Sequence, residues 1–378
     1  MASEIRVNKI INRSGLSTVT FSDTGAIVSG IVTANSFSGA VTGSGANLTS
    51  IPAGQLTGTV ADARLSTVSS SKLSGALPAL DGSALTGVGL GTDGSANTSG
   101  IITATAFVPT TQGSLSHRNI AINGAMTIAQ RGTSSTATSG YHTVDRWEQN
   151  HGSTDEAPTF TTFSVDPPGA YHLPTTGPHP YKEGFRQAWG VTNGNQTSGA
   201  GADDNIIMGY VFEAQDIATS GWDYTNPNSF ITLSFWIKSS VAQEFYGQLN
   251  TQDGTIYNYP FGTGALTAFT WKKVVKTIPG NANITFNNDN GAGLRFYLWA
   301  FAGTNLTGNV TNDAWMVNNY STRVSNNTTT WYTTNDASLQ ITGFQLEVGS
   351  VATPFEHRSH QEELIRCQRY FNMIGDGT

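Results

Sequence analysis

The sequence has little charge, one cysteine and no long apolar run. Charged residues make up 12% of its 378 residues, about half the usual share. The single cysteine, Cys367, excludes an intrachain disulfide framework and a zinc cluster built on several cysteines. No signal peptide or membrane-spanning helix is predicted, because neither an N-terminal apolar region nor 18 consecutive apolar residues occur. A formal net charge of -7 disfavours a nucleic-acid partner.

Aromatic residues are nearly absent from the first third of the chain. The protein has 18 Phe, 12 Tyr and 8 Trp, yet residues 1–116 contain only Phe21, Phe37 and Phe107. Aromatic side chains supply much of the burial energy of ordinary cores. A Gly/Ser/Thr-rich segment without them buries too little apolar surface to offset its ordering entropy alone. This segment is therefore either a flexible linker or a structure that shares its core with other chains.

Internal repeats favour the shared core. The sequence SGIVTA at 29–34 returns as SGIITA at 99–104, and GANLTSI at 45–51 resembles GSALTGV at 82–88. Short β-branched runs between glycine turns suit stacked strands that bury their faces against neighbouring units. We therefore expect residues 29–116 to form an elongated β-repeat stalk in an intertwined homo-oligomer.

Residues 117–356 are typical of an antiparallel β-sandwich, jelly-roll-like, in an all-β protein. Apolar residues alternate with polar ones in 231–238, as in a strand with one buried face. In 294–301, however, Tyr297, Trp299 and Phe301 occupy the second face, which either packs a second layer or presents an aromatic platform. Near the end of this zone the alternation shifts by one residue at Gly343, which predicts a β-bulge.

The last zone, 357–378, changes to a helical period. Leu364, Cys367 and Phe371 form one stripe of a short amphipathic helix. Ser359 is its expected N-cap, with Glu362 three residues later completing a capping box. A helix this short needs a surface to pack on.

Three stretches in this order resemble the C-terminal domain of many bacteriophage tail-fibre proteins. They are NIAINGAMTIAQRG at 119–132 with Tyr141 and Asp145-Arg146-Trp147, then QLEVGSVATPFE at 345–356, and finally EEL at 362–364 with CQRYF at 367–371. Together they span about residues 117 to 371. The N-terminal repeats are also similar to stalk sequences of tail fibres, especially those of cyanobacterial phages.

The resemblance implies a virion protein, a homotrimeric tail fibre assembled in the host cytoplasm. Residues 1–28 would attach it to tail or baseplate proteins. The C-terminal domain of such proteins has a sandwich fold similar to carbohydrate-binding modules and is thought to contact host surface polysaccharide. This chain stops soon after Tyr370-Phe371, whereas some relatives continue, so a non-binding connector or short fibre remains an alternative.

Residues 119–147 follow the change from Gly/Ser/Thr-rich to aromatic-rich sequence, and their pattern has a structural interpretation. Ile120, Ile122, Met126 and Ile128 predict a pair of apolar strands joined by a turn at Asn123-Gly124. We expect Trp147 to pack in the core and Asp145 or Arg146 to tie down a loop. The alternative for these three residues is direct contact with a ligand.

Signatures of enzymes and metal sites are scarce. No nucleophile elbow, P-loop or zinc-protease helix occurs. The acidic pairs Asp155-Glu156 and Asp203-Asp204 lie in Gly/Ser/Pro-rich sequence typical of solvated loops. The protein is therefore not expected to be an enzyme, with a glycan depolymerase as the less favoured alternative. No metal or cofactor is expected, although 287–291 (NNDNG) contains oxygen ligands suited to calcium as well as to an ordinary Asx turn.

Sugar binding fits the remaining composition best. Aromatic rings stack on the C–H faces of sugars, and nearby amides bond the hydroxyl groups. The glycan-binding candidates lie in three segments and can equally be sandwich edges or subunit contacts: Trp222, Asp223, Tyr224, Tyr257, Tyr259, Trp331 and Tyr332. The predicted function is host attachment by multivalent glycan binding.

Overall fold

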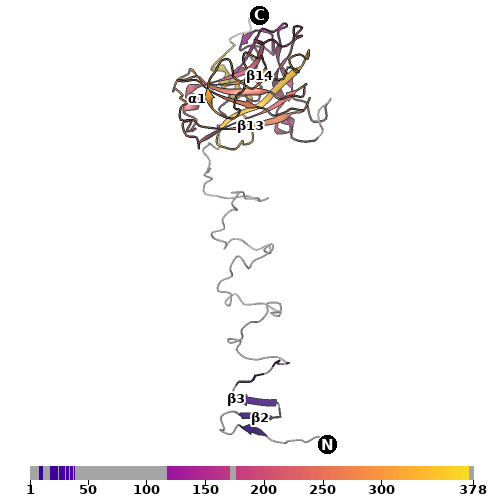
Figure 1. Cartoon of the computed structure of the whole chain (residues 1–378), viewed down its shortest axis with the longest axis vertical. Coiled ribbons are helices and arrows are strands. Elements are labelled where there is room, and N and C mark those ends of the chain that lie inside the picture. Colours follow the sequence, from indigo (N-terminus) through magenta and orange to yellow (C-terminus); the bar gives the residue numbers. More distant parts are fainter. Residues whose placement is uncertain are drawn as a thin grey trace. The chain divides into compact units, whose positions relative to one another are not determined.

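The chain divides into two units, Met1–Gly100 and Ile101–Thr378, in a computed structural model of the protein (Figure 1). The structure describes residues 8–11, 18–23, 25–29, 31–33, 35–36, 38, 117–170 and 176–373. Within these residues, none of the helices has the length and apolar character required to cross a bilayer.

The described part of the first unit is a three-stranded antiparallel sheet. Its strands, in sheet order, are β1 (Lys9–Ile11), β2 (Thr18–Ser22) and β3 (Gly25–Ser29). Some apolar side chains in and after this sheet are exposed, with Ile27 of β3 at 63% and Ile31, after β3, at 96%. The repeats predicted over 29–116 fall almost entirely outside the described residues, so the stalk stays a prediction.

The second unit is an antiparallel β-sandwich, as the sequence predicts. One sheet has six strands in the order β13 (Lys272–Pro279), β10 (Phe230–Ser239), β16 (Ser338–Val348), β8 (Gln187–Thr192), β7 (Thr159–Ser164) and β4 (Ser134–Ser135). The other has seven in the order β15 (Met316–Val317), β12 (Tyr257–Gly262), β11 (Tyr246–Thr251), β14 (Ala292–Ala302), β9 (Asn205–Glu213), β6 (Trp147–Gly152) and β5 (Ser139–Gly140).

Three short helices accompany the sheets in the described residues. They are the 3-10 helix η5 (Pro180–Glu183), α1 (Ala214–Ala218) and α2 (His360–Gln368). Helix α1 follows β9 directly, and α2 follows the last strand, β16.

Aromatic rings from both sheets meet in the core between them. Phe235 of β10 lies 5.8 Å from Phe296 of β14, and Phe296 lies 4.7 Å from Phe344 of β16. Trp147 of β6 is fully buried and lies 5.0 Å from Phe344. Edge-to-face pairs of this kind add to the burial energy. The prediction that Trp147 packs in the core is therefore confirmed.

The outward face of the six-stranded sheet is covered as well. Trp236, on the second face of β10, is fully buried and packs with Phe185 and Trp271. Its indole Nε1 donates to Glu183 Oε2 at 3.1 Å, so η5 is fastened over this face.

The predicted β-bulge at Gly343 is confirmed. The pairing of β10 with β16 shifts between Ser234 and Trp236, opposite Gly343. Gly343 has a φ of 62°, and a Cβ there would lie 2.7 Å from the ring of Phe185. Glycine meets both demands because it lacks a Cβ. The bulge turns Phe344 inward, where it joins the core cluster.

The predicted strand pair at 120–128 is wrong. This segment contains no strand, and Asn123 and Met126 have positive φ values of 59°. The Asn123 side chain supplies the hydrogen bonds that a neighbouring strand would have given: its Nδ2 donates to the carbonyls of Ile128 and Asp145, and its Oδ1 accepts from the amides of Thr127 and Ile128. A buried amide thus organises a compact loop, although the turn at Asn123-Gly124 is present.

The segment preceding Trp147 ties down neighbouring loops, as predicted. Asp145 accepts from the amide of Gln130 at 3.1 Å and lies 3.7 Å from Arg131. Arg146 donates to the carbonyl of Val211 at 2.6 Å, and its guanidinium lies 3.5 Å from the ring centre of Tyr370.

Helix α2 begins where the sequence predicts. The Ser359 side chain accepts from the amide of Glu362 at 3.2 Å. Cys367 is buried against Ile122 and Ile128 of the loop at 119–132, which we call the entry loop, with Leu364 beside it. Burial raises the pKa of the Cys367 thiol to about 12, so the thiol is neutral at physiological pH.

Replacing Asn123 with alanine tests the loop's organisation. Asn123→Ala leaves four backbone groups without their partner in a buried site, so we expect the free energy of unfolding to fall by about 3 kcal/mol. All eight tryptophans lie in 147–331, so urea unfolding followed by tryptophan fluorescence reports on the sandwich. Asn326→Ala, at an exposed loop position, is the control and should change stability little. Equal stability of the two variants would contradict this account of the loop.

Candidate functional site

Four of the predicted glycan-binding rings are core residues. Trp222 and Tyr259 are 3% and 2% exposed, and Trp331 and Tyr332 are 0% and 1% exposed. Tyr332 stacks on Phe301 at 4.1 Å inside the sandwich. A sugar outside the protein cannot stack on these buried rings. The structure therefore corrects their assignment, since the segments that carry them turn inward.

The other three candidates do not gather into a site either. Tyr224 and Tyr257 are half-buried and pack against the core, Tyr224 at 5.0 Å from the ring of Phe286. Asp223 is exposed and accepts from the Thr225 hydroxyl at 3.2 Å.

The segment proposed for calcium is an Asx turn. Asp289 Oδ1 accepts from the amide of Gly291 at 2.9 Å, and the side chain and amide of Asn287 both donate to Asp253. Among the described residues, no group of three or more His, Cys, Asp or Glu side chains is placed to hold a metal ion.

A different surface brings functional side chains together: the face of the seven-stranded sheet turned away from the core. Strand pairing aligns one residue from each of five strands across this face. Glu148 of β6 pairs with Gly209 of β9, and Gly209 pairs with Tyr297 of β14. Tyr297 in turn pairs with Gln248 of β11, and Gln248 pairs with Pro260 of β12.

Gly209 leaves room between Glu148 and Tyr297 in this row. A Cβ at this position would lie 2.7 Å from Glu148 Cγ and 3.1 Å from Tyr297 Cδ1. These distances are shorter than van der Waals contact, so any larger residue would push the two flanking side chains apart. The absence of a side chain at 209 lets Glu148 and Tyr297 approach each other over the sheet.

Two cavities of about 200 and 220 Å³ adjoin this row and share Arg295, Tyr297 and Arg323. We call the pair the outer groove. Its first part lies over β5, β6 and β9, and its second part over β11 and the loop after β15. The lining residues are Ser139, Gly140, Glu148, Gln149, Asn150, Ile207, Gln248, Asn250, Gln252, Arg295, Tyr297, Asn318, Tyr320 and Arg323.

Charges and hydroxyls interact closely in the outer groove. Arg295 Nη1 donates to the Tyr297 hydroxyl at 2.8 Å. Burial raises the pKa of Glu148, and the positive charge of Arg295 opposes this rise without cancelling it. Burial and the nearby Glu148 carboxylate also raise the pKa of Tyr297, which keeps its hydroxyl protonated.

Several polar atoms of the outward face have no protein partner. Within the described part of the chain, Arg295 Nε, Gln248 Oε1 and Asn258 Oδ1 are buried and make no hydrogen bond. These residues lie on the outward side of three adjacent strands. Buried polar atoms without partners cost free energy, and in native proteins they often mark a place for water or ligand.

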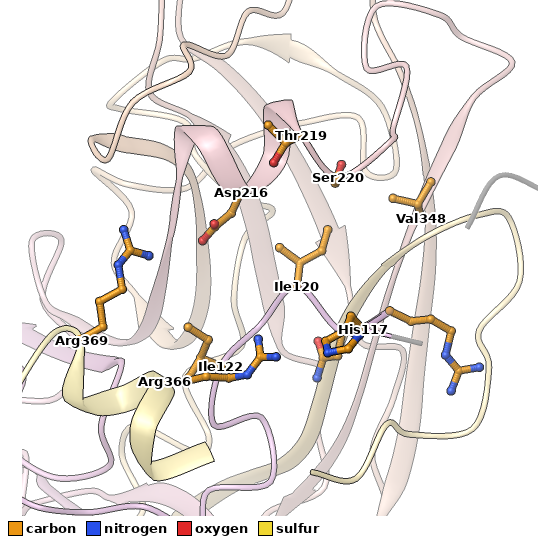
Figure 2. A pocket seen from close by; sticks show the side chains of 11 residues that line it. His117, Ile120, Ile122, Asp216, Thr219, Ser220, Val348, Arg366 and Arg369 are labelled. Carbon is orange, nitrogen blue, oxygen red and sulfur yellow. The ribbon is translucent and has the colours of Figure 1, made fainter. Parts of the chain in front are cut away.

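A separate cavity of about 380 Å³ lies between α1, α2 and the entry loop. Figure 2 shows Asp216 of α1 on one side and, on the other, Arg366 of α2 and Arg369, which follows that helix. These arginines already have partners: Arg366 pairs with Glu362 at 3.1 Å and Arg369 with Glu213 at 2.7 Å. Arg118 Nε, also in this lining, is buried without a partner among the described residues, but the lining contains no Phe, Tyr or Trp, so the cavity is a weaker candidate for a sugar than the outer groove.

The sequence contained part of the signal for the outer groove. The alternation in 294–301 places Tyr297 and Trp299 on a common second face, which was expected either to pack a second layer or to present aromatic rings. The structure does both: Trp299 is buried with Val324, whereas Tyr297 lines the groove. Phe301 instead joins the core, because the pairing of β14 with β9 shifts between Trp299 and Phe301.

No family model matches the sequence, and no curated protein matches it. Among solved structures, the chain is similar to the enzymatically active domain of tailspike protein 4 of bacteriophage CBA120, at 8% identity and a TM-score of 0.29. That match covers 61% of this chain, which spans only 21% of the tailspike chain.

Two carbohydrate-binding domains are also similar in structure. The family 11 carbohydrate-binding module of Clostridium thermocellum, solved with a mixed-linked tetrasaccharide, is 12% identical over 55% of this chain and 91% of its own, with a TM-score of 0.24. The N-terminal cellulose-binding domain of Cellulomonas fimi β-1,4-glucanase C is 10% identical over 60% and 99%, with a TM-score of 0.27. At these scores the similarities establish neither a family nor a ligand for this chain.

The raised pKa of Glu148 predicts a pH-dependent effect of Glu148→Gln on stability. A carboxyl group whose pKa is raised on folding favours the folded state at pH below its unfolded pKa, and this contribution is lost as the pH rises through the folded value. Glutamine mimics the protonated acid, so the stability of the variant relative to the natural protein should be greater at pH 7.5 than at pH 4. Urea unfolding at the two pH values measures the difference. A relative stability that declines as the pH rises would show that Arg295 outweighs burial.

Proposed function

We propose that the sandwich is a glycan-binding module and that its ligand lies in the outer groove. The observation that carries the proposal is the combination around Tyr297: a half-buried ring stands beside unpartnered groups of Arg295 and Gln248. The apolar face of a sugar ring packs on an aromatic side chain, while its hydroxyl groups need donors and acceptors on either side.

The shape of the site suits a chain of sugars. The two cavities run across neighbouring strands and meet at Arg295, Tyr297 and Arg323, so consecutive residues of an oligosaccharide can occupy them in turn. Tyr320, 63% exposed, adds a second ring at the β15 end. Strand-borne side chains are held rigidly, which lowers the entropy lost on binding.

The proposal is one of binding without cleavage. Hydrolysis of a glycosidic bond commonly needs two carboxyl groups facing each other across the scissile bond. In the described lining of the outer groove, Glu148 is the one carboxyl group. A depolymerase would therefore need a second acid from elsewhere, and we do not propose one.

We further propose that the chain is a homotrimeric virion fibre that attaches to the host cell surface. The support is the tail-fibre resemblance of 119–147, 345–356 and 362–371, together with the aromatic-poor first third. Exposed Ile27 and Ile31 in the first unit are suited to burial against sister chains. Several copies on one fibre raise avidity by roughly 10²–10⁴ over a single weak site.

Replacing Tyr297 with alanine tests the glycan site. We expect Tyr297→Ala to weaken binding of a monovalent oligosaccharide about tenfold, because a lost aromatic contact costs about 1.4 kcal/mol. The ligand is first selected on an array of bacterial surface glycans, and its affinity for the full chain is then measured by calorimetry.

Tyr181→Ala is the matched control for this experiment. Tyr181 belongs to η5, which covers the opposite sheet, and this variant should bind as the natural protein does. If the natural protein binds no glycan on the array, the sandwich is a non-binding connector and the proposal fails. Equal affinity of both variants would move the site away from Tyr297.

The trimer has a direct test. Light scattering of the full chain should give three times the monomer mass of 40.0 kDa, because the first unit needs sister chains to bury its apolar residues. A folded, monodisperse monomer at micromolar concentration would contradict the fibre proposal while leaving the glycan site intact.

A further inference from the structure

Arg323 carries a positive charge into the outer groove that the protein does not neutralise. It lines both cavities and is half-buried. Within the described residues, no carboxylate lies within 4 Å of its guanidinium. Its Nε donates to the carbonyl of Tyr320 at 3.2 Å, and its Nη atoms make no hydrogen bond in this part of the chain.

The backbone of Arg323 is fixed from two sides. Its amide donates to the carbonyl of Leu306 at 2.9 Å, and its carbonyl accepts from Asn258 Nδ2 at 2.7 Å. Asn258 is fully buried on β12. The next residue, Val324, is also fully buried and packs with Trp299 of β14. These contacts hold the arginine over the sheet and place its guanidinium 5.8 Å from the ring centre of Trp299.

The other charges of the outer groove are already balanced against each other. Glu148 and Arg295 influence each other electrostatically, and Arg295 also bonds the Tyr297 hydroxyl. Burial lowers the pKa of Arg323, and only Tyr297 and Tyr320 oppose that change. A desolvated cation without an acidic partner is costly for the free protein, and the cost is recovered when an anion arrives.

We propose that the outer groove takes an anionic glycan, whose carboxylate or sulfate group pairs with Arg323 while a neighbouring sugar ring lies over Tyr297. A guanidinium presents a planar set of donors that matches two oxygens of such a group at once. The inference rests on the proposed glycan-binding function and goes further by naming the class of glycan. The protein's net charge of -7 gives no general attraction for anions, so selectivity must come from this local cation.

Matched pairs of oligosaccharides test the inference on the full chain. The first pair is oligogalacturonate and its carboxyl-reduced form, and the second is a sulfated galactan oligosaccharide and its desulfated form. We expect the acidic member of at least one pair to bind about ten- to a hundredfold more tightly, as a charge-assisted hydrogen bond provides. The pair that shows the preference identifies the anionic group. Raising the salt concentration should reduce the preference.

Three variants assign the preference to Arg323. Arg323→Gln should lower the affinity for the acidic member to that for the neutral one, and Arg323→Lys should keep part of the difference because it keeps the charge. Lys182→Gln, an exposed cation on η5 over the opposite sheet, should change nothing. Unchanged urea unfolding curves establish that the variants are folded.

The outcomes separate the two proposals. Equal or tighter binding of the neutral members, with Tyr297→Ala still weakening it, overturns the anionic inference and leaves the glycan site standing. An acidic preference that survives Arg323→Gln also overturns the inference. Failure of every pair to bind contradicts this inference, and absence of binding on the wider glycan array contradicts the proposed function itself.

Discussion

The register of β14 against β9 and β11 determines both the core and the outer groove. Side chains alternate between the two faces of a strand, so a slip of one residue would exchange the faces completely. In the observed register Phe296 packs against Phe235 and Phe344 inside the sandwich, and its neighbour Tyr297 lies outside between Gly209 and Gln248. The core can form only in this register, so the packing that stabilises the sandwich also fixes the positions of the residues that line the outer groove.

The first and last segments of the sandwich domain are joined by buried polar contacts, and we call this contact region the closure. Asn119 bonds the backbone of Phe344 and Leu346, which joins the entry loop to β16. Arg358, before α2, reaches back to the carbonyl of Ala121 at 3.0 Å. The Arg146 guanidinium lies over the ring of Tyr370, two residues after α2. These contacts bring together the start of the sandwich domain, the end of β16 and the segment after α2.

The outer groove differs from this closure in how its polar groups are used. At the closure, Arg358 pairs with Glu356 and Glu363 and bonds two backbone carbonyls, although its Nε and that of Arg146 have no partner among the described residues. In the groove, Arg295 and Gln248 retain unpaired atoms and Arg323 has no acidic partner among the described residues. Buried donors and acceptors without partners beside a tyrosine ring lower the stability of the fold. A polar ligand that bonds these groups would offset that cost.

The amino-acid sequence alone determined the antiparallel β-sandwich, the bulge at Gly343 and the capped helix after Ser359, because each depends on local periodicity or on the needs of one residue. It could not determine that Trp222, Tyr259, Trp331 and Tyr332 turn inward, or that Asn123 replaces a strand pair. Nor could it predict that Glu148, Tyr297 and Arg323 line the same groove. Those outcomes depend on which distant strands pair and which loop covers which face, and such long-range contacts leave no periodic trace in any one segment.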